Sequence, residues 1–240
     1  MEPSSGFRVV WCAGVPTLRA ELLEAAGIPH AFTTRRGDAD GEAIRSSGLD
    51  PAAVVEVEQV HGGTIVRVGK GDVGRTVPGA DGLWTAEVGV TLRVRGADCP
   101  LVLVADPTSG RVAAVHAGWR GLAAGILARA VGSLADAGSV AASLRCAVGP
   151  CVGPCCYEVD APVWEALQQW PEAFSPGRPG RWQLDLRAVA RAQLCAAGVR
   201  PEGVTVATVC TACEADWFYS YRREGRTASQ WAFVAAPRVR

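Results

Sequence analysis

Three side chains in this sequence have the types and the local settings of metal ligands. His61 lies in the segment QVHG (59–62), Cys99 in ADCP (97–100) and His116 in AVHAGWRG (114–121). Two imidazoles and a thiolate are typical zinc ligands, and three protein ligands leave the fourth tetrahedral position open for water or substrate. The pattern therefore indicates a catalytic zinc site, and His61, Cys99 and His116 are called the donor triad below.

Taken one at a time, the members of the donor triad have ordinary explanations. A lone histidine beside apolar residues is more often a satisfied core or surface residue, and a lone cysteine is usually a small buried hydrophobe. Their positions favour function, because Cys99 precedes the apolar run 101–105 and His116 ends the run 112–115. Both residues are expected at strand ends, where side chains emerge from a rigid scaffold.

The elements that must position the triad read as short strands with some helices between them. Apolar runs and alternating patterns predict strands over 7–11, 30–34, 54–58, 64–68, 90–95, 100–105, 111–115, 144–148, 204–208 and 229–234. Helical periodicity predicts helices over 17–26, 121–134, 161–170 and 186–196. Neighbouring strands without a helix between them favour an α+β fold with mixed sheets over a doubly wound parallel sheet.

Five ordered motifs carry a resemblance to a known family. They are QVHG (59–62), ADCPLVLVAD (97–106), VHAGWRG (115–121), GPCVGPCCYEV (149–159), and CT (210–211) followed by YSYRR (219–223). In this order they resemble the bacterial relatives of the multicopper polyphenol oxidase, or laccase-domain, family, which are described as purine nucleoside phosphorylases. The resemblance runs from about Phe32 to the C-terminus.

The resemblance implies both a fold and an activity. The family fold is a sandwich of mixed β-sheets flanked by helices, expected here as a single domain over 1–240. The matching residues of the family bind zinc, which here means His61, Cys99 and His116. The implied reaction is phosphorolysis of adenosine, inosine, guanosine or methylthioadenosine to the free base and a pentose 1-phosphate, with an adenosine deaminase activity beside it.

Further residues are candidates for handling the substrate. Arg120 lies at the start of the predicted helix after His116, whose free N–H groups suit an oxyanion. Arg35 and Arg222 occur in family-matching segments, and guanidinium groups bind phosphate through paired hydrogen bonds. Asp98 and Glu58 are candidates for proton transfer, although a carboxylate beside a metal ligand is as often a residue that orients the ligand.

Three other functions are weighed against the phosphorylase. A chain with three histidines cannot build the trinuclear cluster of a blue copper oxidase, although copper can occupy the same three donors and give phenol oxidation as a secondary activity. A cysteine hydrolase would use Cys99 as nucleophile and His116 as base without a metal. In a binding module the metal would be structural, and its removal would unfold the chain.

Composition agrees with a compact enzyme acting on small molecules. The chain has 240 residues, is 49% hydrophobic and has a formal net charge of zero, and no basic run would follow a phosphate backbone. Lys70 is the only lysine, which excludes a Walker-type phosphate loop. No signal sequence or membrane span is predicted, so we expect a cytoplasmic protein whose partners are nucleoside and phosphate, with no nucleic acid and no membrane.

The nine cysteines should be reduced thiols in that compartment. Cys210 and Cys213 form a CxxC-like pair, and a Gly/Pro loop contains Cys151, Cys155 and Cys156. A second metal site or a redox pair is an open alternative there. We favour packing in tight turns, because the clusters lack a histidine and the paired spacing of zinc knuckles.

One segment departs from the family pattern. Relatives usually have paired glycines, a serine and a longer stretch with a helix between the threonine-arginine segment and the QVHG motif. Here only the short insert 39–58 connects Asp38 with Gln59. We expect this difference to open the pocket, to change the substrate preference or to leave the pocket wall at this segment to a neighbouring subunit.

Overall fold

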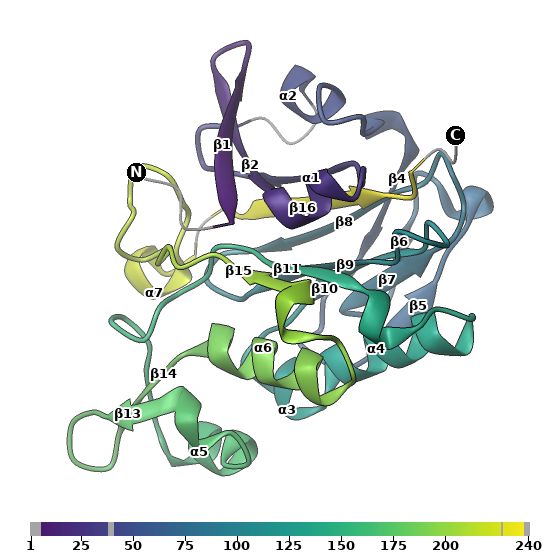
Figure 1. Cartoon of the computed structure of the whole chain (residues 1–240). Coiled ribbons are helices and arrows are strands. Elements are labelled where there is room, and N and C mark those ends of the chain that lie inside the picture. Colours follow the sequence, from purple (N-terminus) through teal and green to yellow (C-terminus); the bar gives the residue numbers. More distant parts are fainter. Residues whose placement is uncertain (1–5, 38–40, 227, 238–240) are drawn as a thin grey trace.

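Two mixed β-sheets lie face to face and enclose much of the hydrophobic core (Figure 1). The computed structural model describes residues 6–37, 41–226 and 228–237. In spatial order the first sheet contains β1 (Phe7–Cys12), β2 (Val15–Ala20), β3 (His30–Thr33), β16 (Gln230–Ala235), β8 (Thr91–Gly96), β4 (Val54–Val57) and β6 (Thr76–Val77). The second contains β15 (Val204–Val206), β11 (Arg145–Val148), β9 (Leu101–Ala105), β10 (Val112–His116), β7 (Gly82–Thr85) and β5 (Ile65–Arg67).

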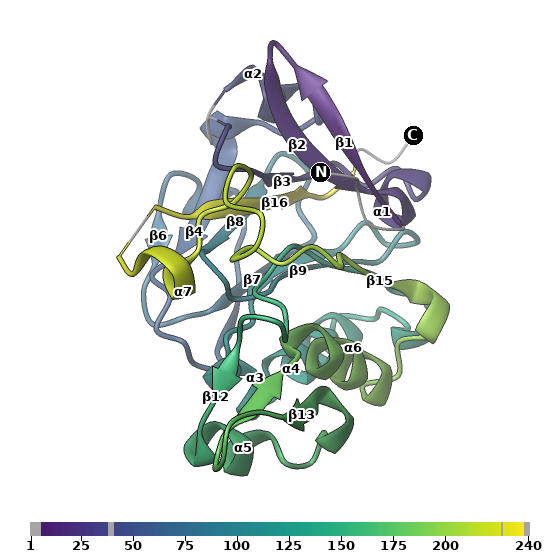
Figure 2. The same cartoon turned by 90° about the vertical axis from the view of Figure 1, so that its left-hand side faces the viewer.

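Helices cover the outer face of the second sheet, so the molecule has a sheet–sheet–helix order (Figures 1 and 2). They are α3 (Trp119–Ala123), α4 (Ile126–Asp136) and α6 (Leu186–Ala196), whereas α5 (Ala161–Leu167) packs against α3. Within each main sheet, parallel and antiparallel neighbours occur together. The predicted α+β class, with mixed sheets flanked by helices, is confirmed.

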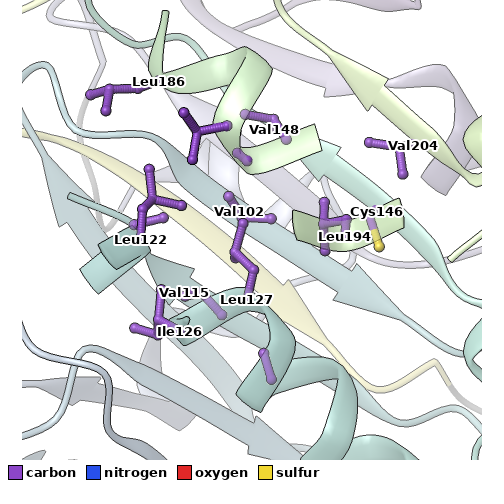
Figure 3. Packing of buried hydrophobic residues seen from close by; sticks show 14 of the residues in the cluster. Val102, Val115, Leu122, Ile126, Leu127, Cys146, Val148, Leu186, Leu194 and Val204 are labelled. Atoms are coloured by element: carbon purple, nitrogen blue, oxygen red, sulfur yellow. The ribbon is translucent and has the colours of Figure 1, made fainter. Parts of the chain in front are cut away.

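Strand β9 explains why the middle layer is apolar on both sides. Because successive side chains of a strand point to opposite faces, Leu101 and Leu103 face the first sheet, whereas Val102 and Val104 face the helices. All four side chains are buried. Figure 3 shows Val102 among side chains of α3, α4 and α6, including Leu122, Leu127 and Leu194. A strand buried on both faces reads as a continuous apolar run, as β9 does.

The predicted helix over 17–26 is wrong for its first four residues and right for residues 21–25. Strand β2 occupies 15–20, and only α1 (Glu21–Ala25) is helical. β2 pairs antiparallel with β1 through a two-residue turn at Ala13 and Gly14, which both have positive φ. Such turns match the twist of a hairpin, and the pairing overrides the local helical periodicity.

The predicted helix over 121–134 is two helices. α3 ends at Ala123 and α4 begins at Ile126, because Gly125 between them adopts a left-handed φ of 73°. A left-handed residue ends a helix, and glycine takes that conformation without steric cost. The buried stripe of α4 still follows helical spacing through Ile126, Ala130 and Leu134.

The other predicted strands and helices are confirmed with shifts at their ends, and α6 matches 186–196. Elements that sequence reading missed are α2 (Glu42–Arg45), α7 (Tyr221–Glu224), β6, β7 and a small third sheet of β12 (Glu158–Val159), β14 (Trp182–Leu184) and β13 (Phe174–Pro176). The insert 39–58 is described from residue 41 onward, and residues 38–40 lie outside the described part. Among the described residues, no helix has the length and apolar character needed to cross a membrane.

Candidate metal centre and substrate cavity

The donor triad comes together from three separate segments. His61 lies in the loop after β4, Cys99 lies two residues before the start of β9, and His116 is the last residue of β10. The potential ligand atoms of the three residues all lie within 4.8 Å of one another. The two imidazole rings meet edge to face with centroids 4.8 Å apart. The expectation that Cys99 and His116 stand at strand ends is confirmed.

Asp81, which sequence reading missed, fixes both histidines. Its side chain is fully buried, and Oδ1 accepts a hydrogen bond from His116 Nδ1 at 2.9 Å. The same carboxylate accepts the backbone N–H groups of His61 at 2.9 Å and of Gly62 at 2.6 Å. With Nδ1–H donated to Asp81, the Nε2 atom of His116 is left as the available ligand atom.

Two triad segments adopt backbone conformations that non-glycine residues rarely take. His61 has a φ of 60° and Asp98 a φ of 94°. Each such conformation costs on the order of 1–3 kcal/mol and persists when surrounding contacts hold it. Asp81 provides those contacts for His61, and Asp98 is held by Thr211 Oγ1 and the backbone N–H of Arg222, both donating at 2.6 Å.

Gly118 allows the chain to pass directly beside the donor triad. A Cβ atom at this position would lie 3.1 Å from Cys99 Sγ, 3.3 Å from His61 Cδ2 and 3.5 Å from His116 Cε1. A side chain would therefore occupy space next to all three donors. The close packing around Gly118 therefore explains why the AVHAGWRG motif has a glycine at this position.

The electrostatics of the triad favour a thiolate beside an imidazolium in the metal-free protein. Burial opposes ionisation of Cys99, but hydrogen bonds with His116 and His61 outweigh it and lower the pKa of the thiol to about 6. Burial also opposes the charge on His116, yet Asp81 and Cys99 raise its pKa to about 9. Burial opposes the charge on Asp81, but the interactions with His116 and the backbone N–H groups of Gly62 and His61 together outweigh it and lower the pKa of Asp81. The site is built to stabilise a cation among these groups.

The residues present fit a zinc ion of the open, catalytic kind. Two imidazoles and a thiolate form the donor set, Asp81 orients one imidazole, and Gly118 keeps the adjoining space clear. A carboxylate behind a ligating histidine is the usual outer partner of such a ligand. The same donors can also bind copper.

The triad opens into a cavity of about 850 Å³. It is lined by Gln59, His61, Arg95, Gly96, Ala97, Asp98, Cys99, His116, Trp119, Arg120, Tyr157, Tyr221, Arg222 and Ser229. The lining combines three guanidinium groups with three large aromatic rings. A volume of this size accommodates a small-molecule ligand of the size of a nucleoside.

Two of the three predicted phosphate-binding arginines line this cavity. The guanidinium of Arg120 lies 4.3 Å from the ring centroid of Trp119, and that of Arg222 lies 4.9 Å from the ring centroid of Tyr157. Arg95 lines the cavity as well and was missed, because a single arginine in a strand pattern gives no functional signal in sequence.

Arg35 is not among the described residues that line the cavity. Its guanidinium donates to the carbonyl oxygen of Ala215 at 2.6 Å and pairs with the Glu224 carboxylate at 2.9 Å. These contacts give Arg35 a role in holding the C-terminal loop. We therefore leave Arg35 out of the phosphate-binding set proposed below.

The two candidate proton-transfer carboxylates have different surroundings. Both oxygens of Asp98 accept hydrogen bonds, from Thr211 and from the backbone of Arg222, and this geometry favours the orienting role that the sequence left open. Glu58 is exposed and is not among the described residues lining the cavity. Its backbone N–H donates to Val77 at the edge of the first sheet.

The chain matches a known family and known proteins over most of its length. Residues 29–237 match the family model described as multi-copper polyphenol oxidoreductase laccase. The purine nucleoside phosphorylase YlmD of Geobacillus stearothermophilus is 42% identical over 191 residues, covering 74% of this chain and 70% of that protein. The purine nucleoside phosphorylase SCO2081 of Streptomyces coelicolor is 38% identical over 234 residues, covering 95% and 93%.

Solved structures show the same fold. The crystal structure of YlmD from Geobacillus stearothermophilus superposes with a TM-score of 0.87 at 32% identity, covering 95% of this chain and 98% of that one. The crystal structure of the hypothetical protein YfiH from Bacillus licheniformis superposes with a TM-score of 0.86 at 28% identity, with the same coverage.

Proposed function

The chain belongs to the multi-copper polyphenol oxidoreductase laccase family, and we propose that it is a zinc-dependent purine nucleoside phosphorylase. Its substrates are adenosine, inosine, guanosine and methylthioadenosine, and its products are the free base and a pentose 1-phosphate. We place the reaction in the cytoplasm. The names of the relatives support the reaction class, and the cavity supports the assignment of residues.

One observation carries the proposal: the donor triad and the guanidinium groups of Arg120 and Arg222 line the same cavity. Phosphorolysis needs a site that holds an anion next to a neutral, aromatic substrate. Guanidinium groups bind phosphate through paired hydrogen bonds. A metal ion held by the donor triad beside them would help to orient the attacking phosphate.

The reaction exchanges one bond for another. A phosphate oxygen forms a bond to the anomeric carbon of the ribose, the glycosidic bond to the purine breaks, and its electron pair stays on the purine nitrogen, which then takes a proton. Arg120 and Arg222 bind and orient the phosphate. Zinc held by His61, Cys99 and His116 would supply a Lewis acid for an oxygen of phosphate or substrate.

The aromatic side chains give the cavity a surface for the purine. Trp119 and Tyr157 line it, with the guanidinium groups of Arg120 and Arg222 over their rings, and Tyr221 lines it as well and is 64% exposed. A purine ring gains stacking energy on such faces. Asp98 fixes the backbone of Arg222 and so acts as a positioning residue.

A deaminase activity toward adenosine belongs to the same proposal. Water would replace the amino group on the purine carbon and release ammonia, with no need for phosphate. Copper bound by the same donors would be a substitution for zinc, and phenol oxidation would be a secondary activity of that form.

A cysteine hydrolase remains the second candidate, because the Cys99 thiol has a lowered pKa beside His116. It would hydrolyse its substrate through a covalent intermediate on sulfur, without a metal. Alkylation would then inactivate the protein while chelators would not. The phosphorylase predicts loss of activity with both treatments.

Product analysis tests the proposal. Protein of known zinc content is incubated with adenosine, with and without inorganic phosphate. Adenine that forms only with phosphate supports phosphorolysis, and inosine that forms without phosphate supports deamination. If no free base and no deaminated nucleoside forms from any of the four nucleosides, the proposal is wrong.

A further inference from the structure

We propose that Cys155, Cys156, Cys210 and Cys213 bind a second zinc ion, distinct from the donor triad. The four Sγ atoms lie within 4.8 Å of one another. They come from two loops, one after β11 and one after β15, so the chain brings together pairs that are more than fifty residues apart in sequence. These four residues are called the thiol cluster.

The distances in the thiol cluster fit a single tetrahedral ion. Sγ of Cys213 lies 3.6 Å from Sγ of Cys155 and 3.5 Å from Sγ of Cys156. Sulfurs bound to one zinc at about 2.3 Å are separated by roughly 3.8 Å in a tetrahedron. A disulfide would need about 2.05 Å, and all four cysteines are free thiols.

Backbone amides already surround the one buried sulfur of the cluster. The N–H of Gly153 donates to Cys210 Sγ at 3.1 Å. The backbone amides of Cys213 and Ala212 also interact with this sulfur. N–H groups that converge on a cysteine sulfur favour the thiolate, which is the form that binds metal.

The frame that holds the four sulfurs does not depend on the thiols. Cys151 and Cys210 form a parallel backbone bridge between the two loops, and the N–H of Thr211 donates to the carbonyl oxygen of Cys151 at 3.0 Å. Gly153 permits the close approach, because a Cβ there would lie 3.3 Å from Cys155 Sγ. The backbone therefore preforms the arrangement before any ion binds.

The chemistry of the donors indicates the ion and its role. Four thiolates in a tetrahedron select zinc or another thiophilic ion, and four protein ligands close the coordination shell. Cys155 and Cys213 are exposed, which gives an ion access from solvent.

The thiol cluster adjoins two residues of the substrate cavity. Tyr157, which lines the cavity, directly follows Cys156. Thr211 directly follows Cys210 and donates to Asp98 Oδ1 at 2.6 Å, beside Cys99. A zinc ion at the cluster would join the two loops and fix this wall of the cavity, so its role is structural.

Metal content tests the proposal independently of any enzymatic activity. The protein is produced with zinc, purified under reducing conditions and analysed for zinc per chain. We expect two zinc ions in the parent, one in Cys99→Ala, one in Cys213→Ser and none in the double variant. Cys12→Ser, at a half-buried cysteine outside both groups, is the matched control and should keep two.

Cobalt gives a second measurement on the folded parent chain and on Cys99→Ala. Cobalt bound by Cys99→Ala should show the intense thiolate charge-transfer bands of a tetrahedral four-sulfur site, and the thermal midpoint of this variant should fall when metal is removed. One zinc in the parent that is lost completely in Cys99→Ala would overturn the proposal. A parent mass lower by two hydrogens, with two fewer titratable thiols, would also overturn it by identifying a disulfide.

Discussion

The carboxylate of Asp81 accepts a hydrogen bond from His116 Nδ1 at 2.9 Å, and both side chains are almost completely buried. The same carboxylate holds the backbone of His61, so one residue fixes two members of the donor triad. Asp81 is therefore a positioning residue for the metal centre.

Asp81→Asn should weaken zinc binding without unfolding the chain. The amide keeps the shape of the carboxylate but loses the charge that orients and polarises His116. Replacing such outer partners typically costs about 10–100-fold in metal affinity. Competition with a chelator measures the change. Asp136→Asn, at an exposed carboxylate at the end of α4, is the control, and equal affinities in the two variants would contradict the role of Asp81.

Gly118→Ala should lower zinc occupancy because its Cβ would lie 3.1 Å from Cys99 Sγ. Gly132→Ala is the matched control, since nothing lies within 4 Å of a Cβ at that position in α4. The control should keep its zinc and gain up to about 1 kcal/mol in the free energy of unfolding from helix propensity. Normal zinc content and affinity in Gly118→Ala would count against the steric argument.

Arg222→Ala should raise the KM for phosphate about tenfold or more and change the KM for the nucleoside less. A hydrogen bond to a charged group is worth about 1.5–3 kcal/mol, and about 1.4 kcal/mol corresponds to tenfold in affinity. Initial rates at varied phosphate measure the effect. Arg178→Ala, at a highly exposed arginine in the loop between β13 and β14, should behave as the parent. An unchanged phosphate KM in Arg222→Ala would remove this residue from the phosphate site.

His30 should make the fold sensitive to acid. Its Nε2 accepts the N–H of Ala20 at 2.8 Å and its Nδ1–H donates to the carbonyl oxygen of Ile28 at 2.8 Å, so the folded chain needs the neutral ring. Burial lowers the pKa of His30 from 6.5 to about 4. Between these values the unfolded chain binds a proton that the folded chain does not, and stability falls as the pH falls.

The lowered pKa of His30 corresponds to roughly 3 kcal/mol in the free energy of unfolding at pH 7, and this amount is lost progressively between about pH 6.5 and pH 4. Denaturant unfolding of the metal-depleted parent and of His30→Gln across this range measures it. The stability difference between the two should shrink with acid. A difference that stays constant across the range would show that His30 is not the group responsible.

The sequence alone predicted those features that depend on the local pattern of apolar residues. Cys99 and His116 could be placed at strand ends because the apolar runs beside them are strands buried on both faces. It failed where distant pairing decides the structure. β2 pairs with β1 across a hairpin, and its local periodicity alone indicated a helix.

Contacts between distant segments also explain why the sequence did not reveal some of the site residues. Asp81 meets His116 across 35 residues, and nothing in its own segment distinguishes it from a turn aspartate. The thiol cluster forms because two loops are paired through the Cys151–Cys210 bridge, which cysteine spacing does not reveal. Contacts between loops depend on sheet order, and sheet order is a property of the whole chain.

The most direct test of the account compares the parent with Cys99→Ala in one assay, with zinc measured in both samples. We predict that the parent forms adenine and ribose 1-phosphate from adenosine in a phosphate-dependent manner. Cys99→Ala should remain folded, lose the zinc of the donor triad and form neither product. Phosphate-dependent adenine formation by Cys99→Ala at the parent rate would contradict the central claim.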